Sequence, residues 1–290
     1  MKYKSIFLTG GAGYVGSQLV PFLLKKGYHV TVYDIMYFGD SFLPKKNKNL
    51  KIIKGDIRDN EKLKASCENH DVFINLACIS NDSSFVLDEK LSKSINYDAF
   101  EPMVISSKKN GIKRFIHAST SSVYGVSEKK NVKEDHPLVP LTLYNHYKAL
   151  IEPILLNNLN NSFEGVIFRP ATVCGYAPKQ RLDLSVNILT NFAFNKSFIK
   201  VFGGEQLRPN LHILDYCEAI ELFLCAEKQD INKEIFNVGY QNLSIYEIAC
   251  SVKKVVEKVL KDNKSIKIIK TESDDKRSYH INSDKIKNKL

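Results

Sequence analysis

Short apolar runs alternate with longer amphipathic stretches along the first 170 residues of the chain. Runs rich in β-branched and aromatic residues predict six strands, at residues 5–9, 29–34, 50–56, 71–77, 114–120 and 164–170. Between them, apolar positions recur with helical spacing over residues 15–26, 60–68 and 87–109. Strands that alternate with helices predict a parallel sheet covered by helices on both faces.

The alternation loosens after residue 170, where we expect a second unit to begin. A further apolar run at 235–239 predicts one more strand, which returns to the first sheet. The expected fold is therefore an α/β, doubly wound parallel sheet. It has a first domain over residues 1–173 and a smaller α/β lobe made mainly of residues 174–290.

Composition and charge narrow the class of protein. Hydrophobic residues at 43% and charged residues at 26% are typical of a globular protein, and no apolar run approaches the ~20 residues that cross a bilayer. The apolar stretch near the start is interrupted by Thr9 and glycines, so it predicts a strand rather than a signal peptide, and we expect a cytoplasmic location. The six cysteines form no C-x-x-C pair, so we expect free thiols and no metal site. The net charge of +10 comes from scattered lysines, which indicates a solvated surface and no nucleic-acid partner.

A glycine-rich turn follows the first predicted strand directly. Gly10, Gly13 and Gly16 have G-x-x-G-x-x-G spacing and open a predicted helix, where bare backbone and the helix N-terminus can bind a pyrophosphate. Asp34 ends the second predicted strand, 18 residues past Gly16, where a carboxylate can bind the hydroxyls of an adenosine ribose. No basic residue follows Asp34 to pair with a ribose phosphate. The pattern therefore predicts NAD rather than NADP.

A second group of residues suggests proton chemistry. Thr120 lies at the end of a predicted strand, and Tyr144 and Lys148 are four residues apart, on one face of a predicted helix. A neighbouring ammonium and a bound nicotinamide ring would both lower the pKa of the phenol, which makes Tyr144 a candidate general base. Thr120 would hold the substrate alcohol in line. His117, in an apolar strand, is interpreted as a core residue.

Together these motifs resemble the extended short-chain dehydrogenase/reductases of the nucleotide-sugar epimerase and dehydratase type. The resemblance covers nearly the whole chain, through TGGAGYVG, GDIRD, NLA, SINYDA, STSSVYG, FRPATVCG, LRPNLHILD and IFNVG. It implies a Rossmann-like NAD domain, a substrate-binding lobe and, in many relatives, a homodimer. The residues it places at NAD are Gly10, Gly13, Tyr14, Val15, Gly16, Asp34, Asp56, Ile57, Leu76, Ala77, Tyr144, Lys148 and Arg169.

The same resemblance implies a nucleotide diphosphate sugar as substrate. The residues expected to contact it are Ser80, Asn81, Thr120, Arg181, Asn187, Arg208 and Arg277. Of these, the arginines suit the geometry of a diphosphate. Ser80 and Asn81 would hydrogen-bond sugar hydroxyls.

One departure from the family narrows the reaction. Ser121 and Ser122 follow Thr120, where the sugar dehydratases carry acidic residues, and a hydroxyl cannot replace the proton chemistry of a carboxylate. Dehydration and decarboxylation are therefore disfavoured. We expect an epimerase that oxidises and re-reduces a sugar hydroxyl, at C4, through a keto intermediate. A dehydrogenase or reductase with net redox change, or an NAD-binding sensor without chemistry, remain as alternatives.

Overall fold

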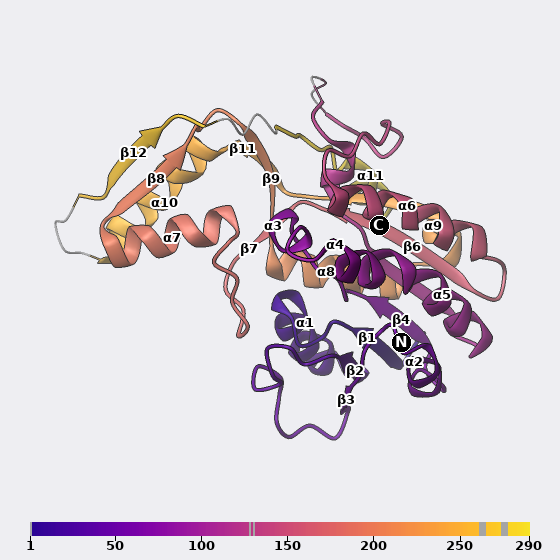
Figure 1. Cartoon of the computed structure of the whole chain (residues 1–290). Helices are drawn as coiled ribbons and strands as arrows, with labels where there is room; N and C mark the ends of the chain where they lie inside the picture. The colour runs from indigo at the N-terminus through magenta and orange to yellow at the C-terminus, as the bar shows by residue number, and fades with distance from the viewer. Residues whose placement is uncertain (1, 128, 130, 261–264, 274–277) are drawn as a thin grey trace.

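A seven-stranded parallel sheet forms the main body of the protein (Figure 1). The computed structural model describes residues 2–127, 129, 131–260, 265–273 and 278–290. The strand order is β10-β6-β5-β4-β1-β2-β3, and every neighbouring pair is parallel. The strands are β1 (Ser5–Thr9), β2 (His29–Asp34), β3 (Leu50–Lys54), β4 (Val72–Asn75), β5 (Arg114–Ala118), β6 (Glu164–Pro170) and β10 (Glu234–Val238). The predicted doubly wound fold and its returning strand are confirmed.

Alternate residues of the sheet face two separate helical layers. Ile6 and Leu8 of β1 pack with α1 (Tyr14–Lys25) and α8 (Ile213–Cys225). Phe7, between them, faces the opposite layer, which contains α2 (Asn60–Ser66), α5 (Phe100–Lys109) and α6 (Leu143–Asn158). The short helices α9 (Lys228–Ile231) and α11 (Asp284–Lys289) lie beside β10. Because helices cover both faces of the sheet, a binding site is expected at the carboxyl ends of its strands.

The helix expected over residues 87–109 is broken into three pieces. They are α4 (Glu89–Lys93), a π-helical turn η1 (Ser94–Asp98) and α5, preceded by a short helix α3 (Asp82–Phe85). Pro102 has no N–H to donate to the turn before it, which weakens the helix there. Asn96 in the π-helical turn also binds the backbone of Ile79, accepting from its N–H at 2.8 Å and donating to its carbonyl at 2.9 Å. The break therefore ties this helical segment to the chain that follows β4.

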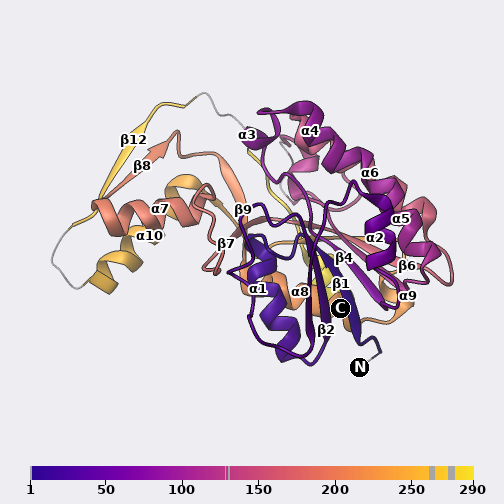
Figure 2. The same cartoon turned by 60° about the horizontal axis from the view of Figure 1, so that its bottom comes forward.

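A smaller lobe extends to one side of the main sheet, as both views show (Figures 1 and 2). It has its own apolar core, formed by α7 (Ser185–Lys196), α10 (Ile245–Leu260) and the strand pair β8 (Phe198–Phe202) and β12 (Lys267–Thr271). A three-stranded sheet of order β11-β9-β7 links it to the main body, made of β7 (Thr172–Cys174), β9 (Leu207–His212) and β11 (Gln241–Ser244). None of the helices in the described part of the chain has the length and apolarity needed to span a membrane.

Candidate active site

The glycine loop between β1 and α1 brings bare backbone to the carboxyl ends of the strands. Gly10 has φ +76°, and a Cβ there would lie 2.6 Å from the nitrogen of Ala77, at the end of β4. A Cβ on Gly16 would lie 2.3 Å from the carbonyl oxygen of Gly11. Gly13 caps α1 without a side-chain hydrogen bond, and the nearest atom to a Cβ there is 3.3 Å away. The first N–H groups of α1 are thus available to an anion.

Asp34 closes one side of this loop at the end of β2. Its carboxylate accepts hydrogen bonds from the N–H of Ala12 at 3.0 Å and from the N–H of Met36 at 2.8 Å. Each oxygen retains a lone pair for a further donor. The uncapped start of α1 and the bare backbone of the glycine loop fit the pyrophosphate of NAD. The fixed carboxylate of Asp34 fits its ribose.

The other predicted NAD residues lie around the same strand ends. Leu76 and Ala77 follow β4, and Val15 and Tyr14 begin α1. Asp56 lies beyond β3, where Arg58 donates to both carboxylate oxygens, with a shortest distance of 2.5 Å. This hydrogen bonding lowers the pKa of Asp56. The contact between Arg58 and Asp56 is not predicted from the sequence, although the two residues are only two positions apart.

Arg169 lies near the end of β6, and its side chain hydrogen-bonds partners within the protein. Its side chain is 2% exposed and forms two hydrogen bonds with the carboxylate of Glu152, at 3.0 and 2.6 Å. It also donates to the hydroxyl of Tyr124 at 2.7 Å. The guanidinium thus joins β6 to α6. Contact between Arg169 and NAD stays a prediction.

Thr120, Tyr144 and Lys148 come together where β5 ends and α6 begins. Lys148 is 3% exposed, and its ammonium donates to the carbonyl of Ala118, the last residue of β5, at 2.8 Å. Tyr144 lies one turn earlier on α6, near Thr120, whose hydroxyl lowers the pKa of the phenol. The predicted phenol, amine and hydroxyl therefore share one site.

Burial and nearby charges set the pKa of Tyr144. Its pKa is raised well above the ordinary value, first by burial of the phenol and then by Cys78 and Asp82. Arg181 and the hydroxyl of Thr120 act in the opposite direction and lower it. The predicted effect of Lys148, together with a bound nicotinamide, stays a prediction. In the chain alone, the phenol is therefore protonated at neutral pH.

A set of polar contacts lies across this site, and we call it the clasp: Arg181 and Asp183 with Ser80 and Asn81. Arg181 binds Asp183 with two N–H groups, at 3.0 and 2.5 Å, and donates to the hydroxyl of Ser80 at 2.9 Å. The side-chain amide of Asn81 donates to the Asp183 carboxylate, at 3.1 Å. Three residues predicted to bind the substrate, Ser80, Asn81 and Arg181, thus lie together. In this structure they bind each other or Asp183. Asp183 was missed by the sequence analysis.

Asn187 connects the clasp to the glycine loop. Its amide donates to the carbonyl of Arg181 at 2.9 Å and to the hydroxyl of Tyr14 at 3.2 Å. Its oxygen accepts from the N–H of Gly175 at 2.9 Å. Asn187 is 6% exposed, and these contacts hold the segment before α7 against the glycine loop. Its predicted contact with substrate stays a prediction.

The remaining substrate predictions fall on the lobe. Arg208, in β9, donates to the carbonyl of Leu207 at 2.9 Å, and its guanidinium lies 4.9 Å from the ring centre of Tyr279. Arg277 lies outside the described residues. His117 is fully buried, as interpreted from the sequence. Its Nδ1 lies 3.3 Å from the amide nitrogen of Asn75.

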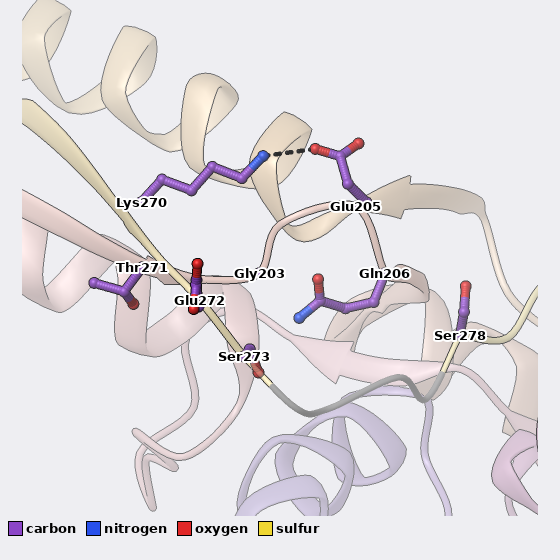
Figure 3. Close-up of a pocket in the computed structure, with 8 residues that line it drawn as sticks. All are labelled: Gly203, Glu205, Gln206, Lys270, Thr271, Glu272, Ser273 and Ser278. Carbon is purple, nitrogen blue, oxygen red and sulfur yellow. Dashed lines mark hydrogen bonds and ion pairs between the residues drawn. The ribbon is translucent and has the colours of Figure 1, made fainter.

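A cavity of about 720 Å³ lies on the lobe, between the turn after β8 and the end of β12 (Figure 3). Lys270 and Glu205 form an ion pair of 2.7 Å at its edge. Its described lining residues include none of the predicted site residues. Within the described ranges, no three His, Cys, Asp or Glu side chains gather as metal ligands.

Comparisons with known proteins agree with this geometry. The model of the NAD dependent epimerase/dehydratase family matches residues 6–239. The chain is 31% identical to an uncharacterized UDP-glucose epimerase, YtcB, of Bacillus subtilis, over 81% of this chain and 76% of that protein. It is 29% identical to a UDP-N-acetyl-alpha-D-glucosaminuronate decarboxylase of Bacillus cytotoxicus, over 85% of this chain and 78% of that protein.

Solved structures share the whole fold. The UDP-glucose 4-epimerase of Thermus thermophilus, in complex with NAD, superimposes with a TM-score of 0.83 at 21% identity, covering 98% of this chain and 91% of that one. The predicted fold and the prediction of NAD as cofactor are confirmed. The chain belongs to the NAD dependent epimerase/dehydratase family.

Proposed function

We propose that this protein is an NAD-dependent nucleotide-sugar epimerase that acts on a sugar hydroxyl, at C4, through a keto intermediate. Its relatives include nucleotide-sugar epimerases, decarboxylases and dehydratases, so the family alone leaves the reaction open. The observation that carries the proposal is the placing of Thr120 and of the helix bearing Tyr144 and Lys148 at the end of β5, with no carboxylate in the turn that follows.

The chain's own residues account for the proton chemistry. Tyr144 takes the proton of the sugar hydroxyl at its phenol oxygen and returns it to the keto oxygen once the sugar has turned over. Thr120 hydrogen-bonds the same sugar oxygen and keeps it in line with Tyr144. NAD, when bound, supplies a hydride acceptor and donor for the sugar carbon. Lys148, whose ammonium donates to the carbonyl of Ala118, would bind the ribose of the cofactor.

The turn after β5 favours this reaction over dehydration. The turn is a 3₁₀ helix, η2 (Ser121–Tyr124), whose sequence SSVY contains no acid. Ser121 is 3% exposed, and Ser122 donates to the amide oxygen of Asn145 at 2.5 Å. Elimination of water needs a group that removes a carbon-bound proton, and neither serine has that basicity.

The substrate would be held by its nucleotide diphosphate and left loose at the sugar. In this proposal Arg181 exchanges Asp183 for the diphosphate, and Arg208 approaches it from the lobe. Ser80 and Asn81 then bind sugar hydroxyls. Association as a homodimer is part of the same proposal and rests on the family resemblance.

The test is to incubate the protein and NAD with UDP-glucose, UDP-N-acetylglucosamine and their dTDP and GDP counterparts. An epimerase converts a sugar to its C4 epimer with no net change in the absorbance of reduced nicotinamide. Accumulation of reduced nicotinamide would instead establish a dehydrogenase. Tyr144→Phe should lower turnover by about 10²–10⁴-fold, whereas Tyr147→Phe, on the same helix, should retain it. Full turnover in Tyr144→Phe would refute the proposed base.

A further inference from the structure

A buried oxygen in the small sheet that links the lobe to the main body lacks a hydrogen-bond partner. It is the side-chain amide oxygen of Asn210, in β9, a residue that is 5% exposed. No donor within the described part of the chain reaches this oxygen. Buried polar atoms are almost always hydrogen-bonded, because an unpaired one destabilises the folded state. The oxygen of Asn210 is therefore a candidate contact for a ligand.

The chemistry of the amide shows which kind of ligand group this position needs. The side-chain nitrogen of Asn210 donates to the backbone carbonyl of Arg208 at 2.7 Å. Because a carbonyl can only accept, the NH₂ group must lie on that side, and the oxygen must be the atom without a partner. That oxygen can only accept as well. The ligand group must therefore be an O–H or an N–H, which excludes the oxygens of an ionised diphosphate.

The side chain of Asn210 lies on the face of β9 that is turned away from the core of the main body. Leu211 packs in the core beside α1 and α8, and Val173, its partner in β7, packs against the same core. Side chains alternate along a strand, so Asn210, its β7 partner Thr172 and Arg208 share the opposite face. Since β7 begins one residue after β6 ends, this face adjoins the carboxyl ends of the main sheet.

A second buried group without a partner in the described ranges lies at the start of α7. It is the hydroxyl of Ser185, the first residue of this helix, which has no side-chain cap. Asn187 accepts from the N–H of Gly175, so the first turn of α7 lies against the end of β7, the strand that pairs with Asn210. Both unpartnered groups thus border the region between the lobe and the main sheet, where β7 and β9 cross (Figure 1).

We propose that Asn210 is a specificity-determining residue, whose amide oxygen accepts a hydrogen bond from the sugar hydroxyl at C2, next to the diphosphate linkage. This statement rests on the proposed function, in which Arg208 binds the diphosphate. The two residues are about 7 Å apart along the strand, on one face. Because β9 leads from the lobe into α8 of the main body, Asn210 lies beyond Arg208 in the direction of the reactive residues. The sugar must extend in that direction to react.

The test measures binding and is independent of turnover. Isothermal titration of the NAD-loaded protein compares UDP-glucose, dTDP-glucose and GDP-glucose with their parent nucleoside diphosphates, and the nucleotide that binds most tightly is kept. Asn210→Leu removes the acceptor at similar volume. It should weaken binding of the nucleotide sugar by about 3–10-fold, while binding of the parent nucleotide stays unchanged because Arg208 is retained. The 2-deoxyglucose nucleotide should show the same loss with the unmodified protein, and Asn210→Leu should bind the two sugars equally.

Two further variants separate this role from a general disturbance of the lobe. Asn210→Asp keeps an accepting oxygen, so the ratio of the two dissociation constants, for nucleotide sugar and nucleotide, should persist even if the added charge weakens both. Asn195→Leu, at an exposed position near the end of α7, is the matched control and should leave the ratio unchanged. Thermal unfolding checks that each variant is folded.

The proposal is overturned if Asn210→Leu keeps the ratio of the unmodified protein, which would mean that water alone serves the oxygen. It is also overturned if Asn210→Leu still prefers glucose over 2-deoxyglucose to the same extent, or if the sugar adds nothing to the affinity of the nucleotide. Failure of the proposed function looks different. In that case the ratio depends on Asn210, but no nucleotide sugar is epimerised.

Discussion

Arg169 and Glu152 form a buried ion pair behind the active site, with both side chains at most 3% exposed. Glu152 accepts a further hydrogen bond from the hydroxyl of Ser119 at 2.6 Å. Ser119 directly precedes Thr120, so this pair supports the turn that carries the reactive residues. The same interactions raise the pKa of Arg169 above its ordinary value, although burial opposes the rise.

Glu152→Ala should lower the free energy of unfolding by about 3–5 kcal/mol, because it leaves the Arg169 charge buried without a partner. The double variant Glu152→Leu, Arg169→Met removes both charges and should recover most of that loss. Denaturant unfolding of the three proteins measures the difference. Calorimetry should find that the double variant still binds NAD, because the Arg169 side chain is bound to Glu152 and Tyr124. Lost binding in a folded double variant would support the predicted contact between Arg169 and NAD.

Gly16 and Gly13 should respond differently to alanine. The Gly16→Ala methyl meets the backbone of Gly11 at 2.3 Å, so we expect a loss of about 1–3 kcal/mol in the free energy of unfolding. The Gly13→Ala methyl meets only the carbonyl of Gly10, at 3.3 Å, so the fold should persist. Its methyl extends over the start of α1 and should weaken NAD binding. Equal stability losses in the two variants would contradict this distinction.

His117 should make the fold sensitive to acid. Burial, with the charge of Lys148, holds its pKa well below the ordinary value of 6.5. Below about pH 6.5 the unfolded chain therefore binds a proton that the folded protein excludes. As the pH decreases, the free energy of unfolding falls by up to about 1.4 kcal/mol per pH unit for this one group. Burial also lowers the pKa of His70, which adds to the loss of stability in acid.

His117→Gln removes this titration while keeping an acceptor for Asn75. Its free energy of unfolding should decline less steeply between pH 7 and pH 5 than that of the unmodified protein, as measured by denaturant titration across about two pH units. His146→Gln, at an exposed position of α6, serves as the control. An identical slope in all three proteins would show that His117 is not the group responsible.

Arg181 should act on both substrate affinity and the pKa of the phenol. Arg181→Met removes the cation that lowers the pKa of Tyr144, so the acid limb of the turnover profile should move to higher pH. Loss of charge-assisted bonds to the diphosphate should weaken UDP binding by about 10-fold or more. Isothermal titration with UDP checks the second effect without turnover. Lys196→Met, in the last turn of α7, should leave both the turnover profile and UDP binding unchanged.

The strands were predictable from the sequence because runs of apolar residues indicate buried segments. β1, β2 and β6 coincide with the predicted runs, since each is a β-branched or aromatic segment buried on both faces. The break before α5 was not predicted, because it depends on Asn96 reaching Ile79, a contact between segments 17 residues apart. Local periodicity carries no information about such a contact.

The site was predictable only as far as spacing determines it. Tyr144 and Lys148 share a helix, so their neighbourhood follows from the sequence. The partners of Arg181 and Arg169 do not, because Asp183 and Glu152 are common residues whose charge gives no sign of what they bind. The link from Ser122 to Asn145 joins segments that meet only after β5 and α6 have packed.

The return of β10 to the sheet has a consequence for dividing the chain. Its residues pair with β6 from Glu234 to Val238, while the lobe's segments lie before and after it in the sequence. A fragment that ends anywhere before β10 leaves one border of β6 with unpaired amides and carbonyls, a surface prone to aggregation. No single cut therefore yields an independent half, and domain exchange with a relative would require at least two crossover points.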